Sequence, residues 1–249
     1  MSPGMTAAGT LEVRSLAFAY PDGRQVLYGV DLSVAPGERV AILGPNGAGK
    51  TTFVLHLNGT LGGGAGSVAV DGLTVGKPTV REVRRRVGIV FQDPDDQLFM
   101  PTVRDDVAFG PANLGFRGAE LEQRVDRALA LTGMAGAADR APHHLSFGQR
   151  RRVAASTVLS MDPTILVLDE PSSNLDPVAR REFADIVLSL GLTTLIVTHD
   201  LLYALQLCPR SVIMNAGRIV ADGPTPDILR DADLLAANRL ELPYGFVMP

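Results

Sequence analysis

The strongest constraint in this sequence is a glycine-rich turn between an apolar, strand-like run and a helix-compatible run. Gly44, Gly49, Lys50 and Thr51 fit the pattern G-x-x-x-x-G-K-[ST]. In such a turn, backbone N–H groups close around phosphate oxygens at a helix N-terminus. A structural turn needs no Lys-Thr pair at this offset, and a chance match has odds of about one in a hundred. We therefore predict a phosphate-binding loop made of Gly44, Pro45, Asn46, Gly47, Ala48, Gly49, Lys50, Thr51 and Thr52.

The composition describes an ordinary globular chain without a broad charged face. The 249 residues are 46% hydrophobic and 20% charged, with a formal charge of −4. This balance argues against nucleic acid as a partner. The short basic runs 84–86 and 150–152 read most simply as solvated helix faces. The single cysteine, Cys208, fits a reducing compartment. No apolar run is long enough for a membrane span, so we expect a cytoplasmic chain.

The order of the elements predicts an α/β fold. Polar and apolar residues alternate in 11–20 and 26–34, and 67–71 would add a strand to the same antiparallel layer. Helical patterns occupy 93–142, and a further helix is expected from Ser146 to about Ser160. Strands at 164–170 and 193–198 alternate with a helix opened by Asp176-Pro177, which indicates a parallel, doubly wound sheet. A late hairpin at 212–221 and one C-terminal helix, about Asp227 to Asn238, complete the expectation.

Several motifs in a fixed order carry a family resemblance. Leu145-Ser146-Phe147-Gly148-Gln149 resembles the LSGGQ signature of ATP-binding-cassette (ABC) ATPases, with Phe147 in place of the first glycine. The run 165–170 resembles their Walker B strand, and 173–176 their D-loop. Gln92 matches the Q-loop, His199 the switch histidine and Tyr20 the adenine-stacking aromatic.

The resemblance implies one ABC ATPase domain over residues 1–249, with a P-loop NTPase (RecA-like) core. A β layer is expected at about 11–40 and 61–75, and an inserted α-helical subdomain at about 93–160. The implied cofactors are ATP and Mg²⁺. Asp169 and Thr51 would ligate Mg²⁺, and Glu170 would polarise the attacking water. Gln92 would ligate Mg²⁺ or orient water, although a glutamine after a strand is also a common loop residue. Lys50 and His199 would stabilise charge on the phosphates.

Other candidate residues admit simpler readings. Ser146 and Gln149 also fit a capping box, which needs no ligand. In the family, Ser146, Gly148 and Gln149 would face the γ-phosphate bound by a second ATPase subunit, identical or related, so that two chains sandwich two ATP molecules. Tyr20 before Pro-Asp-Gly is also an ordinary strand-end residue. We interpret His143 and His144 as loop residues, because adjacent side chains point apart in extended backbone and no third metal ligand is evident.

The segment after Gln92 indicates a subtype. Residues 91–99 and 101–111 resemble the ATPases of energy-coupling-factor importers, above all the cobalt and nickel branch. There, the ATPase sits peripherally at the cytoplasmic face of the plasma membrane, without inserting, and receives helices of a transmembrane coupling protein beside a substrate-binding membrane component. In the simpler reading, Asp95-Asp96 and Asp105-Asp106 are solvated helix starts.

The sequence leaves three alternatives open. The first is the ATPase of another importer or an exporter, which differs only in the segment after Gln92. The second is a soluble machine of DNA repair or translation; Lys50 and Asp169 are 119 positions apart with no heptads between them, and the chain holds one cassette. The third is a nucleotide-binding regulator without turnover, against which Glu170 and His199 argue.

Overall fold

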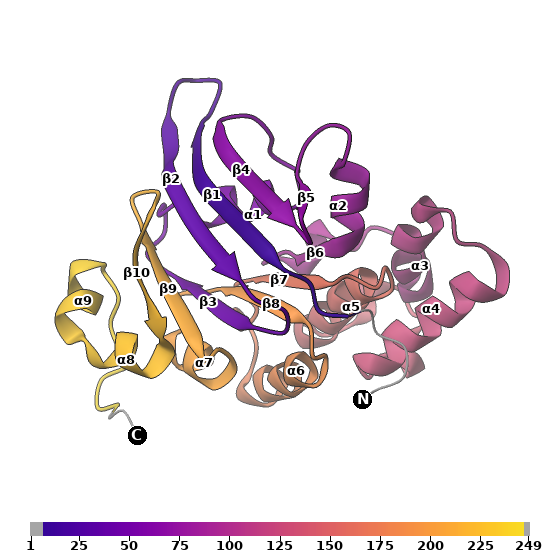
Figure 1. The fold of residues 1–249 in the computed structure, drawn as a ribbon. Coiled ribbons are helices and arrows are strands. Elements are labelled where there is room, and N and C mark those ends of the chain that lie inside the picture. Colours follow the sequence, from indigo (N-terminus) through magenta and orange to yellow (C-terminus); the bar gives the residue numbers. More distant parts are fainter. Residues whose placement is uncertain (1–6, 247–249) are drawn as a thin grey trace. The chain divides into compact units, whose positions relative to one another are not determined.

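The computed structural model describes residues 7–246, which form two compact units (Figure 1). The sheet unit contains residues 7–87, 164–170 and 192–246, and the helical unit contains 88–163 and 171–191. Within the described range, no helix has the length and apolar character needed to span a bilayer.

An antiparallel sheet of four strands begins the sheet unit, in the order β2-β1-β4-β5. Its strands are β1 (Leu11–Ala19), β2 (Gln25–Val34), β4 (Ala65–Val70) and β5 (Leu73–Thr74). Leu11 pairs with Val34 on one side and Val70 on the other, and all three are buried. The alternation of the sequence therefore turns one face of this layer inward, and the predicted antiparallel layer is confirmed.

Parallel strands form the second sheet of this unit, in the order β10-β9-β3-β8-β7. They are β3 (Arg39–Leu43), β7 (Ile165–Asp169), β8 (Thr193–Val197), β9 (Arg210–Asn215) and β10 (Arg218–Pro224), of which only β10 runs antiparallel to its neighbour. Val197 lies between Ile42 and Asp169 in register. The ends of β3, β7 and β8 therefore meet at one edge, where ligands bind in open α/β sheets. The predicted α/β fold is confirmed.

The helices of the sheet unit are α1 (Lys50–Leu57), α2 (Val80–Arg86), α7 (Leu201–Leu207), α8 (Thr225–Arg230) and α9 (Ala232–Ala237). The single C-terminal helix expected from Asp227 to Asn238 is wrong, because the chain breaks at Asp231. Asp231 has a non-helical backbone, with φ −84° and ψ 88°, and its carboxylate accepts the N–H of Leu234. An aspartate that caps a new helix therefore ends the previous one.

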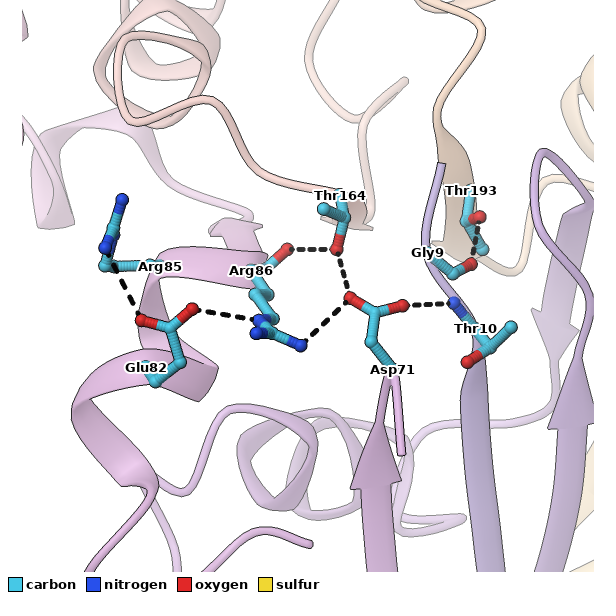
Figure 2. Close-up of polar contacts among 8 residues, drawn as sticks. All are labelled: Gly9, Thr10, Asp71, Glu82, Arg85, Arg86, Thr164 and Thr193. Atoms are coloured by element: carbon cyan, nitrogen blue, oxygen red, sulfur yellow. Dashed lines mark hydrogen bonds and ion pairs between the residues drawn. The ribbon is translucent and has the colours of Figure 1, made fainter. Parts of the chain in front are cut away.

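A polar network joins the antiparallel layer to the start of β7 (Figure 2). Asp71, in the turn between β4 and β5, accepts the N–H of Thr10 at 2.7 Å and the hydroxyl of Thr164 at 3.2 Å. Arg86 lies 3.5 Å from the same carboxylate and also pairs with Glu82. Because Thr164 directly precedes β7, the network fixes the beginning of the strand that ends in Asp169.

Helices build the helical unit. They are α3 (Val103–Leu114), α4 (Gly118–Leu131), α5 (Phe147–Leu159) and α6 (Pro177–Ser189), with the short 3₁₀ helices η1 (Pro94–Asp96), η2 (Ala135–Ala137) and η3 (Pro142–His144). β6 (Val87–Val90) begins in the sheet unit and continues into this one. The apolar face of α4 buries Val125 and Leu129. Thr132, which directly follows the helix, is also buried, and its hydroxyl lies 2.7 Å from that of Ser156 on α5.

Candidate functional site

The glycine-rich loop lies between β3 and α1, and its backbone conformation favours glycine at three positions. Gly44 has φ 150°, and a Cβ atom there would lie 2.1 Å from the carbonyl oxygen of Met214. Gly47 and Gly49 have φ 79° and 100°, in the left-handed region that glycine adopts without strain. The tip of the β9–β10 hairpin supports the loop, because the N–H of Gly217 donates to the carbonyl of Ala48 at 2.9 Å.

The Lys50 side chain folds back onto the glycine-rich loop. Its side chain is buried, and Nζ donates to the carbonyl oxygens of Gly44 at 2.6 Å and Pro45 at 3.0 Å. Burial lowers the pKa of the Lys50 ammonium, while the nearby carboxylates of Glu170 and Asp169 oppose that shift. The loop therefore holds a partly desolvated cation where a polyphosphate would need its charge compensated.

Asp169 ends β7 beside the first turn of α1. The Thr51 hydroxyl lies 3.5 Å from Oδ2 of Asp169, which is almost fully buried. Residues 7–246 contain no group of three or more His, Cys, Asp or Glu side chains that could hold a metal. One carboxylate and one hydroxyl nevertheless fit Mg²⁺, which takes a few protein oxygens and completes its shell with water and substrate phosphates.

Glu170 has an unusual backbone and is held by the end of β8. Its φ is 46°, in the left-handed region, which costs a side-chain-bearing residue about 1–2 kcal/mol. The Glu170 N–H donates to the carbonyl of Val197 at 2.8 Å. The carboxylate lies 3.1 Å from the hydroxyl of Thr198 and 2.9 Å from Nδ1 of His199, whose side chain is 65% exposed. A buried carboxylate is thus fixed beside an accessible imidazole.

Tyr20 contacts the end of the glycine-rich loop. Its hydroxyl lies 3.1 Å from Oγ1 of Thr52, and its ring packs edge-on against Phe18 at 5.0 Å between centroids. The guanidinium of Arg24 lies 5.3 Å from the same ring. Phe18 also packs on His56, whose buried Nδ1 lies 2.7 Å from the carbonyl of Thr52 and whose pKa is lowered by burial. The position of this aromatic ring is therefore set on several sides.

The signature segment begins α5 in the helical unit. Ser146 accepts the N–H of Gln149, and the Gln149 side chain accepts the N–H of Ser146, so the predicted capping box is confirmed. A Cβ at Gly148 would lie 3.0 Å from Cβ of Ala179 on α6, which explains the small residue there. The ring of Phe147 lies 5.4 Å from the guanidinium of Arg151.

Arg151 corrects the interpretation of the run 150–152 as a solvated face, because its side chain is fully buried. It donates to the carbonyl oxygens of Phe91 at 2.8 Å, Gln92 at 2.6 Å and Ser173 at 3.5 Å. Arg151 therefore ties the backbone of Gln92 to α5 and to Ser173, the first residue of the expected D-loop. The run 150–152 in the sequence does not indicate which arginine is buried. Only the packing of α5 shows that Arg151 points inward and donates to backbone carbonyl groups.

The expected residues divide between the two units. The sheet unit brings together Tyr20, residues 44–52, Asp169, Glu170 and His199, whereas Gln92 and the signature residues Ser146, Gly148 and Gln149 belong to the helical unit. From the sequence, extended backbone is expected at His143 and His144. Instead, both residues lie in η3, and their ring centroids are 4.2 Å apart. Sequence reasoning also missed Thr198, whose hydroxyl contacts Glu170.

Comparisons with known proteins show the family of this chain. Residues 27–173 match the ABC transporter family. A putative ABC transporter ATP-binding protein of Streptomyces coelicolor is 69% identical over 98% of this chain and 94% of its own length. The energy-coupling factor transporter ATP-binding protein EcfA of Methanothermobacter thermautotrophicus is 48% identical over 94% of this chain and 76% of its own.

A solved structure is similar over nearly the whole fold. It is cbiO1 from Clostridium perfringens, described as part of the ABC transporter complex cbiONQ. The TM-score is 0.82 at 37% identity, covering 94% of this chain and 95% of that one. The loop, the carboxylates at the sheet edge and the capped signature helix thus occur in a fold shared with transporter ATPases. The chain belongs to the ABC transporter family and is an ATP-binding, ATP-hydrolysing subunit of that family.

Proposed function

We propose that this chain powers an importer of the energy-coupling-factor type, which carries a cobalt or nickel cation or a vitamin. An exposed aromatic pair after Gln92 carries the proposal, supported by the similarity to proteins named EcfA and cbiO1. Phe99 is 63% exposed and Phe109 45% exposed, and their rings pack edge to face with centroids 5.0 Å apart. Large apolar side chains gathered on a surface are typical of a protein interface.

A groove lies beside Phe99. Its volume is about 330 Å³, and it is lined by Leu98, Phe99, Met100, Pro142, His143 and the ion pair of Asp95 with Arg150. Asp95 is 65% exposed in the first turn of η1, which agrees with its reading as a solvated helix start, and its carboxylate also lies 3.0 Å from Nε of Arg150. A groove that combines apolar side chains with an ion pair suits an amphipathic helix of a partner, whose apolar face would lie against Phe99.

The backbone of Phe99 and Met100 is fixed by a buried carboxylate. Asp106 is buried, contrary to the reading of 105–106 as a solvated helix start, and its Oδ1 accepts the N–H groups of Phe99 and Met100 at 3.0 Å each. Burial raises the pKa of Asp106, while these two hydrogen bonds oppose the shift. A fixed backbone presents the Phe99 ring to a partner at little cost in conformational entropy. We propose cytoplasmic helices of a transmembrane coupling protein as that partner.

Each residue of the ATP site then has a proposed role. Lys50 would leave the carbonyls of Gly44 and Pro45 for the β- and γ-phosphates. Thr51, Asp169 and Gln92 would hold Mg²⁺, which when bound neutralises charge on the phosphates. Glu170 would accept a proton from the attacking water. These assignments are supported by the family and by the hydrogen bonds of the sheet unit.

His199 and Tyr20 complete the proposed site. The Nδ1 proton of His199 would be donated to Glu170, so donation to the γ-phosphate would need a second proton on Nε2. A ring protonated at both nitrogens would stabilise negative charge in the transition state. Tyr20 would stack on adenine, a contact worth about 1–3 kcal/mol by analogy with base stacking.

The proposed cycle needs a second ATPase subunit, either another copy or a related chain. Ser146, Gly148 and Gln149 would contact the γ-phosphate bound by the partner subunit, at the positive end of α5. ATP would favour the closed pair, and hydrolysis would reopen it. The groove would pass this movement to the membrane protein, with the ATPase bound peripherally at the cytoplasmic face and the solute held by a separate membrane component.

A second candidate is the ATPase of another ABC importer or an exporter, since the family match covers these equally. A soluble protein of repair or translation is disfavoured by the exposed Phe99–Phe109 pair. The observation that separates the candidates is the identity of the protein bound at the groove.

Copurification from native membranes tests the proposal. The tagged chain should bring down an integral membrane coupling protein and a small-solute-binding membrane protein. Phe99→Asp places a charge in the interface and should lower the recovered membrane protein at least tenfold. Val220→Asp, at an apolar residue 47% exposed on β10, is the matched control and should retain it. Recovery of only soluble proteins, or equal recovery with Phe99→Asp, would contradict the proposal.

A further inference from the structure

The end of β8 holds Glu170 through three successive residues. Val197 accepts the backbone N–H of Glu170 at 2.8 Å, the Thr198 hydroxyl lies 3.1 Å from Oε2, and His199 Nδ1 lies 2.9 Å from Oε1. Both carboxylate oxygens and the backbone of Glu170 therefore depend on one short segment of the neighbouring strand. Of the two side chains in this set that contact the carboxylate, Thr198 is the one with no role in the proposed ATP site.

The direction of the hydrogen bond at Thr198 follows from its other partner. Thr198 is fully buried, and its Oγ1 accepts the N–H of Asp200 at 3.0 Å. A hydroxyl has a single proton and two lone pairs. With one lone pair used by Asp200, the proton remains to be donated to Oε2 of Glu170. The contact is thus a hydrogen bond to a carboxylate, the stronger, charge-assisted kind.

Glu170 also needs an external restraint. Its left-handed backbone, with φ 46°, is one that side-chain-bearing residues rarely adopt and that persists only where the surroundings impose it. The N–H contact to Val197 fixes the backbone, but the orientation of the carboxylate depends on the two side chains that follow β8. His199 is largely exposed, whereas Thr198 is enclosed by the fold. The hydrogen bond from the buried Thr198 hydroxyl is therefore the restraint on the Glu170 carboxylate that solvent does not reach.

We infer that Thr198 is the positioning residue that orients the Glu170 carboxylate for the attacking water. The inference rests on the proposed role of Glu170 as general base. Thr198 contacts neither nucleotide nor water in this role; it holds Oε2 so that the carboxylate keeps one orientation through the catalytic cycle. Because a misplacement of about 1 Å can cost about 10²-fold in rate, loss of this hydrogen bond should reduce kcat and leave ATP binding intact.

The test is the steady-state ATPase activity of three Thr198 variants. Thr198→Val keeps the branched shape and removes the hydroxyl, and it should lower kcat about 10- to 100-fold with KM for ATP within about twofold. Thr198→Ser restores the hydroxyl and should recover most of the rate. Thr198→Ala removes the hydroxyl without a branched side chain and should lower kcat as Thr198→Val does.

Thr194→Val is the matched control. Thr194 is buried in the same strand and its hydroxyl donates to the carbonyl of Leu192 at 3.1 Å, with no contact to Glu170. Thr194→Val removes a hydroxyl from an equally buried threonine. Because that hydroxyl does not contact Glu170, kcat should stay at the wild-type value. Equal losses in Thr194→Val and Thr198→Val, or a failure of Thr198→Ser to recover the rate, would assign Thr198 a structural role and overturn the inference.

The kcat of Glu170→Gln, measured in the same assay, distinguishes a failure of the Thr198 inference from a failure of the proposed general-base role of Glu170. If this variant hydrolyses ATP at the wild-type rate, the general-base role fails and the Thr198 inference fails with it. If Glu170→Gln loses turnover while Thr198→Val and Thr198→Ala keep wild-type kcat, only the inference on Thr198 is wrong. If Thr198→Val does not fold, the comparison of folded Thr198→Ala with Thr198→Ser decides by the same criteria.

Discussion

Nδ1 of His199 lies 2.9 Å from Oε1 of Glu170, so an exposed imidazole is anchored on a buried carboxylate. His199→Ala should lower kcat by about 10²–10³-fold, the loss typical of removing one donor to transition-state charge. The affinity for ATP should change little, since the binding loop is untouched. Isothermal titration and phosphate release measure the two quantities. His144→Ala, an exposed histidine of η3, is the control; equal losses in both variants would exclude a specific role for His199.

Lys50 supplies a buried positive charge to the glycine-rich loop. Lys50→Met keeps much of the length and removes the charge and its hydrogen bonds to Gly44 and Pro45. We expect ATP affinity to fall at least tenfold, because the phosphates lose their cation in a desolvated site. Equilibrium titration with a fluorescent ATP analogue measures the affinity. Wild-type affinity in a folded Lys50→Met protein would exclude Lys50 from phosphate binding.

Gly217, at the tip of the β9–β10 hairpin, should tolerate no side chain. Gly217 and Gly191 have similar φ values of 74° and 67°, so alanine meets similar backbone strain at both. A Cβ at Gly217 would also lie 2.0 Å from the carbonyl oxygen of Val26, whereas at Gly191 it would meet nothing within 4 Å. Gly217→Ala should therefore cost about 1–3 kcal/mol more than Gly191→Ala. Urea denaturation gives the two free energies of unfolding; equal losses would show that the backbone moves away without cost.

Cys208 should make stability fall in alkaline solution. Burial raises the pKa of its thiol from 9.0 to about 12. The unfolded chain therefore loses this proton first, and the free energy of unfolding should fall as pH rises from about 9 towards 12, by up to about 1.4 kcal/mol per pH unit. Cys208→Ala lacks this contribution, so the stability difference between the two proteins should shrink above pH of about 9. A difference that stays constant between pH of about 7 and 10.5 would contradict this.

Local patterns predicted the parts of the fold that local chemistry determines. The alternation of 11–20 defined a half-buried strand, and Ser146 with Gln149 predicted the helix start that the structure has. The order of strands and helices predicted the parallel sheet, because such connections allow few arrangements. Within the sheet, the register that places Val197 between Ile42 and Asp169 follows from pairing of segments distant in the sequence.

Tertiary packing determined what the sequence could not predict. Arg151 and Asp106 stand in charged runs that are typical of solvated helix faces, yet both are buried and bind backbone groups. The hydrogen bond between Asp71 and Thr164 joins residues 93 positions apart. Thr198 follows a strand in which two other threonines are also buried, so nothing in its sequence context distinguishes the hydroxyl that contacts Glu170.

Phosphate release by Glu170→Gln at saturating ATP and Mg²⁺ tests the proposed chemistry most directly. Glutamine keeps the size of the side chain and can still bond to Thr198 and His199, but it cannot accept the proton of the attacking water. We predict retained ATP binding and a kcat about 10²–10⁴-fold below wild type. Turnover at the wild-type rate, with ATP bound as tightly, would show that Glu170 is not the general base.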